Sequence, residues 1–231
     1  MRVKPVLWGA AVAIALSSTV AVANVVVVKS LGPSAKAYPP GKTLPQSAKI
    51  TLQGGDVLTI LGPSAAQTLR GPGNFDAGQV SLASAASQRG RFGALRAAEV
   101  AHNPSVWDVD VSQSGKVCVS DPAKLQLWRP DSDGEAKVQI RSDDGKAQEL
   151  SWAAGKATTA WPAAVPIKSG ANYQIEWPDT GDKSSVDLVL VANAPTDLVG
   201  AAQVLIENGC QKQLDLLVES ASKPTKPGER G

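Results

Sequence analysis

Apolar and polar residues alternate along much of this chain, in short runs separated by Gly, Pro, Asp and Ser. Alternation with a period of two is the pattern of a half-buried strand. In the first half it predicts strands over residues 48–53, 57–61 and 65–70, and the β-branched run at 24–30 predicts a further strand. In the second half it predicts strands over residues 106–111, 116–119, 125–129, 136–141, 149–152, 172–177 and 186–191. Many short strands at regular spacing are typical of a β-sandwich.

Two features refine this picture. The pentapeptide LGPSA occurs at 31–35 and again at 61–65, each time after a predicted strand. Because proline fixes φ and glycine permits a sharp bend, each copy is expected to turn the chain into the next strand. The turn SGANY at 169–173 is a common entry into a strand of an immunoglobulin-like domain.

The periodicity becomes helical near the end of the chain. Thr196 is predicted to cap a helix, Asp197 is well placed for the helix dipole, and the Asn-Gly pair at 208–209 is a stop signal. A second short helix is expected over 211–220, which places Cys210 in the turn of a helical hairpin. The apolar positions at helical spacing are Leu198, Val199, Ala202, Leu205 and Ile206.

Composition divides the chain into five segments. They are a signal peptide (1–23), a small β domain (24–75), a linker rich in Ala, Ser, Gln and Arg (76–104), a β-sandwich with C-terminal helices (105–222) and a basic, Pro-rich, disordered tail (223–231). The predicted fold class is therefore mainly β, with an immunoglobulin-like sandwich that ends in a helical hairpin.

The first residues predict export. Arg2 and Lys4 precede an apolar run over 6–16, and Ala-Val-Ala at 21–23 forms a small-x-small cleavage site. This order is that of a cleavable secretory signal. The run is short for a membrane span, which takes about 20 apolar residues. No later segment is long and apolar enough to span a membrane.

Charge argues against nucleic acid as a partner. The chain has 23 basic and 21 acidic residues, and loss of Arg2 and Lys4 with the signal would leave 21 of each. A protein with this balance has no broad field for nucleic acid or anionic lipid. Arg89 and Arg91 lie in the most basic internal stretch, which is either a solvated linker or a docking or processing segment.

Cys118 and Cys210 are the only cysteines, and an even count in an exported protein suggests one disulfide. Closing so long a loop would contribute about 4 kcal/mol in the chain-entropy model. The alternative is a reactive thiol, which needs a neighbouring base. The single histidine, His102, sits at the end of the predicted linker.

The remaining chemistry is sparse, and we assign no catalytic residue, cofactor or metal. One histidine and two distant cysteines do not make a zinc site. Asp131, Asp133 and Glu135 form the densest acidic cluster, which we interpret as a hairpin turn rather than a calcium loop.

The tryptophans are the most distinctive feature of the second domain. Core packing is the expected role for most of these large side chains. Trp161 and Trp177 each precede a proline, which favours extended or turn geometry at a strand end. These two are therefore the candidates for exposed rings that stack on a sugar or a partner. The tryptophans after the signal are Trp107, Trp128, Trp152, Trp161 and Trp177.

The first domain resembles the FecR-like β domain of bacterial envelope proteins. The resemblance rests on GKTL at 41–44, GDVLT at 55–59 and TLRGPG at 68–73, and it covers about a quarter of the chain. FecR-type regulators usually join this domain to a transmembrane helix and a cytoplasmic segment that contacts a sigma-factor system. This chain has a cleavable signal instead. The resemblance therefore implies the periplasm as the compartment, and it implies no specific activity.

Three functions are consistent with these observations. The first is a non-enzymatic periplasmic envelope protein that interacts with another envelope protein or a cell-wall component. The second is a carbohydrate-binding module that uses exposed Trp161 or Trp177. The third is a carboxylate-dependent enzyme that acts on glycans, for which the sequence singles out no pair of acids.

Overall fold

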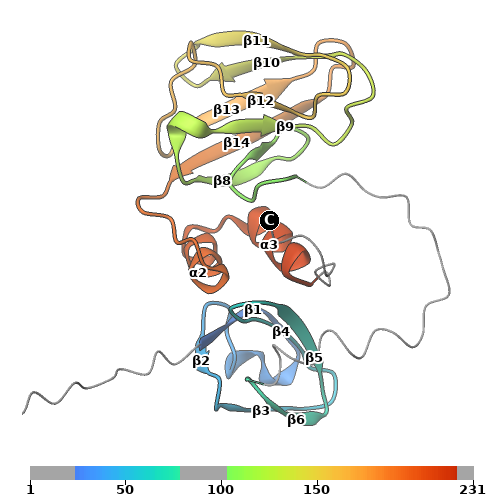
Figure 1. The fold of residues 1–231 in the computed structure, drawn as a ribbon, viewed down its shortest axis with the longest axis vertical. Helices are drawn as coiled ribbons and strands as arrows, with labels where there is room; N and C mark the ends of the chain where they lie inside the picture. The colour runs from blue at the N-terminus through green and yellow to red at the C-terminus, as the bar shows by residue number, and fades with distance from the viewer. Residues whose placement is uncertain (1–23, 79–102, 223–231) are drawn as a thin grey trace, which may run out of the picture.

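The computed structural model describes residues 24–78 and 103–222. The predicted signal (1–23), the predicted tail and Arg89 and Arg91 of the predicted linker lie outside the described residues. The protein is mainly β, and its described parts stack along the long axis of the molecule (Figure 1). Two C-terminal helices lie between a small N-terminal β unit and a β-sandwich, although they follow both in sequence.

The N-terminal unit contains two antiparallel sheets. Its strands are β1 (Asn24–Leu31), β2 (Thr43–Pro45), β3 (Lys49–Leu52), β4 (Val57–Leu61), β5 (Ala66–Arg70) and β6 (Gly73–Asp76). One sheet has the order β2-β1-β4-β5, and β3 pairs with β6 in the other. All four strands predicted here are present. The strands β2 and β6 were not predicted. β2 has only three residues and ends in proline, and β6 begins at the last residue of a Gly-Pro-Gly run, which is typical of a turn.

Both LGPSA copies turn the chain, as predicted. The first forms a short 3-10 helix (Pro33–Lys36) that leads from β1 back toward β2. The second is a tight turn between β4 and β5, closed by the Gly62 N–H, which donates to the Ala65 carbonyl at 2.8 Å.

Asp56 fixes the first of these turns. This carboxylate is 2% exposed and accepts hydrogen bonds from the backbone N–H groups of Ser34 (2.9 Å) and Gln53 (2.6 Å). Gly32 leaves room for it, because a Cβ at this position would lie 2.5 Å from the Asp56 Oδ1. The φ of Gly32 is +100°, which also favours glycine. Asp56 therefore joins the turn before β4 to the 3-10 helix after β1.

The second β unit is a sandwich of two sheets. Its strands are β7 (Val109–Asp110), β8 (Gly115–Val119), β9 (Gln126–Trp128), β10 (Ala136–Ser142), β11 (Ala147–Trp152), β12 (Thr158–Ala160), β13 (Asn172–Glu176) and β14 (Lys183–Leu190). The larger sheet has the order β11-β10-β13-β14-β8 and the smaller β12-β9-β7. β8 runs parallel to β14 and β7 parallel to β9, and the other pairs are antiparallel. Alternate residues of both sheets fill one apolar core, as the period of two predicted.

One predicted strand is mostly a turn. Of residues 106–111 only Val109–Asp110 is a strand. The Asp108 N–H donates to the Ser105 carbonyl (3.3 Å), and the Trp107 N–H donates to the Ser105 Oγ (3.2 Å). Because this turn interrupts the alternation, the half-buried Trp107 packs against the helices rather than in the sandwich core.

The two helices are α2 (Leu198–Asn208) and α3 (Gln211–Ser222), and they confirm the predicted hairpin. The predicted cap is wrong by one residue: Asp197 rather than Thr196 caps α2, and its Oδ1 accepts the Gly200 N–H at 2.8 Å. Gly209 ends α2 in the left-handed conformation, with φ of +72°. At 11 and 12 residues, neither helix of the described chain is long and apolar enough to cross a bilayer.

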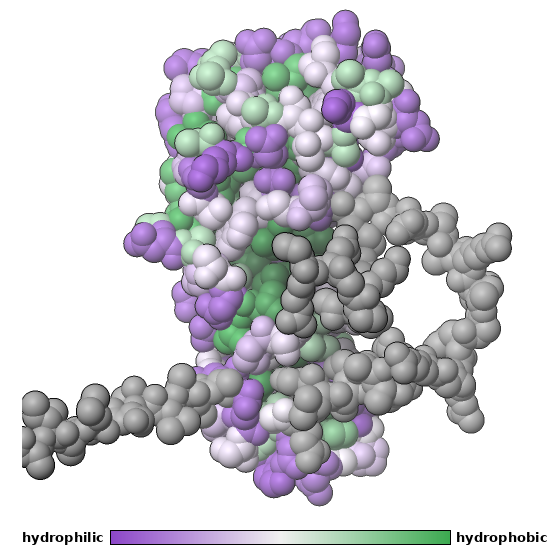
Figure 2. All heavy atoms as spheres, viewed as in Figure 1, coloured by the Kyte–Doolittle hydropathy of each residue, from purple (hydrophilic) through white to green (hydrophobic). Residues whose placement is uncertain are grey.

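Strand β1 explains why the helices lie in the middle. Its four consecutive valines are all buried, which requires cover on both faces of the strand. Val25 and Val27 point into the core of the N-terminal unit, whereas Val26 and Val28 pack against α2 and α3. On the face drawn in Figure 2, apolar residues gather at the level of the two helices and hydrophilic residues cover the two ends.

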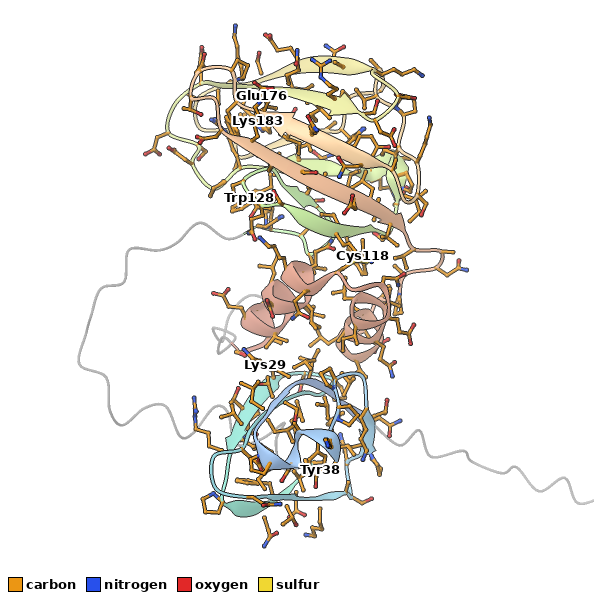
Figure 3. The ribbon with its side chains drawn as sticks, turned by 180° about the vertical axis from the view of Figure 1, so that it is seen from behind. Lys29, Tyr38, Cys118, Trp128, Glu176 and Lys183 are labelled. Carbon is orange, nitrogen blue, oxygen red and sulfur yellow. A yellow bond between two sulfur atoms is a disulfide. The ribbon has the colours of Figure 1, made fainter. Side chains whose placement is uncertain are left out.

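The predicted disulfide between Cys118 and Cys210 is present, with 5.9 Å between the Cα atoms. Figure 3 places Cys118 on the side of the sandwich that meets the helices. Both cysteines are fully buried, so the bond joins β8 to the start of α3 inside the core.

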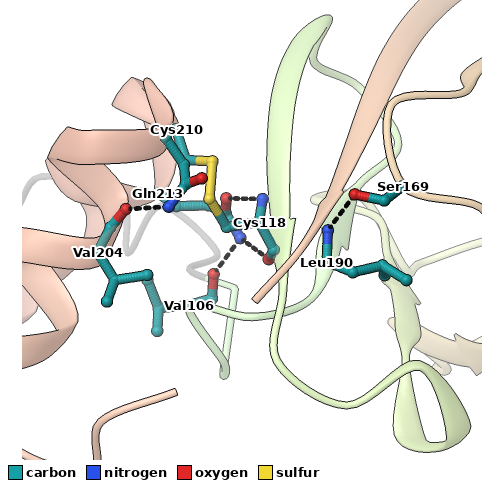
Figure 4. The surroundings of a disulfide bond; sticks show 8 residues. Val106, Cys118, Ser169, Leu190, Val204, Cys210 and Gln213 are labelled. Carbon is teal, nitrogen blue, oxygen red and sulfur yellow. Dashed lines mark hydrogen bonds between the residues drawn. A yellow bond between two sulfur atoms is a disulfide. The ribbon is translucent and has the colours of Figure 1, made fainter. Parts of the chain in front are cut away.

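Gln213, one helical turn beyond Cys210, reinforces the same junction (Figure 4). It is 6% exposed. Its Oε1 accepts the Cys118 N–H at 2.6 Å, and its Nε2 donates to the carbonyls of Cys118 (2.9 Å) and Val106 (2.7 Å). The side chain thus takes the place of a neighbouring strand along the outer edge of β8, which protects that edge from pairing with another chain.

Candidate binding site at one end of the sandwich

A cavity of about 600 Å³ opens at the end of the sandwich where β9 and β13 finish and β10 and β14 begin. A second cavity of about 370 Å³ adjoins it. Glu135, Ala136 and Asp179 line both, so the two form one continuous concave surface. In Figure 3, Glu176 at the end of β13 and Lys183 at the start of β14 flank the turn of the β13–β14 hairpin, and their side chains lie 3.2 Å apart. We call this surface the Trp177 cavity.

Trp177 is the aromatic side chain in the wall of the larger cavity. Its backbone is held by the hairpin: the Trp177 N–H donates to the Asp182 carbonyl (2.9 Å), and the Gly181 N–H donates to the Trp177 carbonyl (2.8 Å). Its ring stacks on that of Trp152, with 6.1 Å between centroids and 12° between planes. Trp152 is 2% exposed, whereas Trp177 is half-buried. A buried ring therefore supports a partly open one.

Arg129 forms another part of the same wall, although it is only 3% exposed. Its Nε donates to the Lys156 carbonyl (3.0 Å), and its Nη2 donates to those of Gly134 (2.7 Å) and Ala153 (3.1 Å). The guanidinium carbon lies 5.7 Å from the centre of the Trp152 ring. Arg129 thus joins the β9–β10 loop to the β11–β12 loop beside the cavity. Among the described residues it forms no ion pair.

The rim of the cavity is mixed in charge. Four exposed carboxylates line it: Asp131, Glu135, Asp179 and Asp182. The Lys183 ammonium at the rim is already paired with Glu176. In the described parts of the chain, no group of three or more His, Cys, Asp or Glu is placed to hold a metal ion. Asp131 has the predicted turn role, since its Oδ1 accepts the Asp133 N–H at 3.0 Å.

The predicted exposure of Trp161 is wrong. Trp161 is 9% exposed and belongs to the sandwich core, where it meets the Tyr173 ring edge-on at 5.0 Å. The residues after Pro162 turn back, with the Val165 N–H donating to the Pro162 carbonyl at 3.0 Å. This turn brings the Val165 carbonyl within 2.7 Å of the indole Nε1, so the ring can be buried with its N–H satisfied.

The sequence analysis missed Arg129 and the acids of the β13–β14 turn. A signal for Arg129 was present, because Leu125, Leu127 and Arg129 alternate and therefore share one face of the strand region. All three are buried, at 4%, 0% and 3% exposure. A charged residue in phase with core leucines indicates a buried charge. The acids at Asp179 and Asp182 follow no periodic pattern, and only the fold brings them to the cavity.

Comparison of the chain with protein-family models, with curated proteins and with solved structures finds no match in any of the three. Inference about function therefore rests on the residues and their geometry.

Proposed function

We propose that this chain is a non-enzymatic binding protein of the bacterial periplasm that holds a saccharide component of the cell wall in the Trp177 cavity. The observation that carries the proposal is the half-buried Trp177 ring, stacked on Trp152 in the wall of a cavity of about 600 Å³. With Trp161 buried, the proposal rests on Trp177 alone.

The chemistry of the cavity suits a sugar. A saccharide ring has an apolar face, and a fixed aromatic ring offers it a flat apolar surface at little entropic cost. Sugar hydroxyls both donate and accept hydrogen bonds. The carboxylates of Glu135, Asp179 and Asp182 can only accept, and the guanidinium of Arg129 can only donate. A rim with both kinds of group therefore suits hydroxyls better than it suits a purely apolar ligand.

The proposed compartment rests on the predicted signal at residues 1–23, and the disulfide is compatible with it. Structural disulfides persist in oxidising compartments such as the bacterial periplasm. If residues 24–75 form a FecR-like domain, as their motifs predict, the same compartment is expected.

The test is binding of the disulfide-intact exported protein to purified cell walls and to oligosaccharides of defined composition, measured by sedimentation and calorimetry. Trp177→Ala should lower the affinity by at least about fivefold, if a sugar ring gains what a nucleic-acid base gains by stacking on an aromatic side chain, about 1–3 kcal/mol. Trp177→Phe should retain much of it. The control is Leu190→Ala, because Leu190 is exposed and lies outside both cavities. Equal binding by wild type and Trp177→Ala would overturn the proposal.

The same experiment distinguishes a binding protein from a glycan-acting enzyme. A glycan-acting enzyme would release new reducing ends from the bound saccharide, whereas a binding protein would return it unchanged. Chromatography of the saccharide after overnight incubation distinguishes the two, and the proposal predicts no new products.

A protein partner is the second candidate, and strand β11 is the observation that favours it. β11 pairs with β10 on one side and forms the edge of its sheet. Its residues 147–149 are exposed, and Ser151 and Trp152 at its end line the smaller cavity. An extended peptide could add to such an edge. A photo-cross-linker at Gln148 should then label a partner protein in living cells, and absence of labelling would dismiss this candidate.

A further inference from the structure

Building on the proposed function, we propose that the saccharide in the Trp177 cavity is acidic, and that Arg129 binds its carboxylate. The proposal rests on the buried guanidinium and on the donors that its hydrogen bonds leave over.

Three of the hydrogen bonds that a guanidinium can donate are already made. Arg129 has five N–H groups, and Nε and both N–H groups of Nη2 have backbone carbonyls as acceptors. Nη1 has no such acceptor. Within the residues that the structure describes, the buried side-chain atoms without a partner are the Gln67 Oε1 and the Trp152 Nε1. Because Nη1 is not one of them, it reaches solvent, and Arg129 meets solvent at the cavity wall.

The charge of Arg129 is also unmatched. The charge of a residue that is only 3% exposed is costly unless an anion or good hydrogen bonds compensate it. The three carbonyls fix the plane of the guanidinium but supply only partial negative charge. No carboxylate lies within 4.0 Å of it in the described chain. A ligand carboxylate would supply both the missing charge and acceptors for the two Nη1 protons.

The stacking of the rings places this donor beside the proposed sugar platform. The guanidinium lies over Trp152, and Trp152 stacks on Trp177. Arg129 and Trp177 therefore line one cavity, so that a sugar ring on Trp177 can present a carboxylate substituent to Nη1. The exposed acids Asp131, Glu135, Asp179 and Asp182 line the same cavity. Their repulsion of an anion lowers its affinity, and their oxygens suit the sugar hydroxyls as acceptors.

The experiment varies the ligand rather than the protein. A uronic-acid oligosaccharide is compared with the same oligosaccharide after its carboxylates have been reduced to alcohols, and both are titrated into the disulfide-intact protein. We expect the acidic form to bind about tenfold more tightly, the gain typical of a charge-assisted hydrogen bond. Asp179→Asn at the rim removes a negative charge, so it should increase the ratio of the affinity for the acidic form to that for the reduced form. Equal affinity for the two forms in the wild type would overturn the inference.

Variants of Arg129 provide the second arm. Arg129→Lys retains a positive charge but loses Nη1, so the preference for the acidic form should fall. Two controls, the affinity for the reduced form and the melting temperature, show whether the variant still folds. If the reduced form binds more tightly than the acidic form, and its binding requires Trp177, the saccharide proposal stands and the proposal of an acidic ligand is wrong. If neither form binds, both are wrong.

Discussion

The junction between the helices and the sandwich gives the sharpest stability prediction, and Gln213 carries it. Substitution of Gln213 by Met keeps the length and volume of the side chain but removes its amide. The N–H and carbonyl of Cys118 and the carbonyl of Val106 then lose their partners at 2.6, 2.9 and 2.7 Å. Water cannot replace the amide easily, because Gln213 is 6% exposed and Cys118 is fully buried.

The magnitude depends on the number of groups left unpaired. A buried donor or acceptor that loses its partner costs about 1–3 kcal/mol. Loss of the partner of both buried backbone groups of Cys118 should therefore lower the free energy of unfolding by about 2–6 kcal/mol. Met packs at least as well as Gln among apolar neighbours, so loss of packing adds little.

Urea denaturation followed by tryptophan fluorescence measures the effect in the disulfide-intact protein. The matched control is Gln211→Met, because Gln211 lies on the same helix but is exposed and bonds to Asp215 at the surface. The control should change the free energy of unfolding by less than about 0.5 kcal/mol. A Gln213→Met variant no less stable than the control would refute the reasoning that this side chain completes the edge of β8.

Other predictions concern the disulfide and the turn at Asp56. The double variant Cys118→Ala, Cys210→Ala should lose about 4–5 kcal/mol in denaturant titrations, because the bond closes a loop spanning 92 residues, and unchanged stability would contradict this. The pKa of Asp56 is lowered, chiefly by a hydrogen bond from the Ser34 side chain. Its carboxylate therefore stabilises the fold at neutral pH, and this contribution is lost as the pH falls through the lowered pKa. Asp56→Asn should be less stable at neutral pH and should show a flatter decline in acid, and parallel pH curves would contradict it. Gly32→Ala should lower the melting temperature by several degrees, because its Cβ would meet the Asp56 Oδ1 at 2.5 Å; an unchanged melting temperature would show that the turn relaxes.

Local pattern was sufficient for most strands, since alternation is set by neighbours along the chain. It failed where the partner lies far away in sequence. The valines of β1 have no polar phase, and this run indicates burial on both faces. The run alone does not predict which element covers the second face of β1. That element is the helical pair α2 and α3, which begins about 170 residues later. The place of the helices between the two β units therefore depends on long-range packing.

The candidate site was also only partly predictable from local sequence. The proline argument predicted exposed rings for both tryptophans. Trp177 does follow a strand end but is half-buried, and Trp161 is buried. The two differ in the segment after the proline, because one folds back to satisfy the indole N–H and the other forms the β13–β14 turn. Arg129 was detectable from its phase with Leu127. Its role at the cavity depends on three carbonyls, one from the β9–β10 loop and two from the β11–β12 loop, which no local pattern predicts.

The central claim is that a saccharide binds against Trp177. The most direct measurement is a titration of ¹⁵N-tryptophan-labelled protein with acidic oligosaccharide, followed by the indole N–H signals in NMR spectra and assigned with Trp177→Phe. We predict saturable shifts of the Trp177 signal, with smaller shifts for its stacking partner Trp152, and no change for Trp107 beside the helices. A titration in which the Trp177 signal stays in place up to millimolar saccharide would contradict the account.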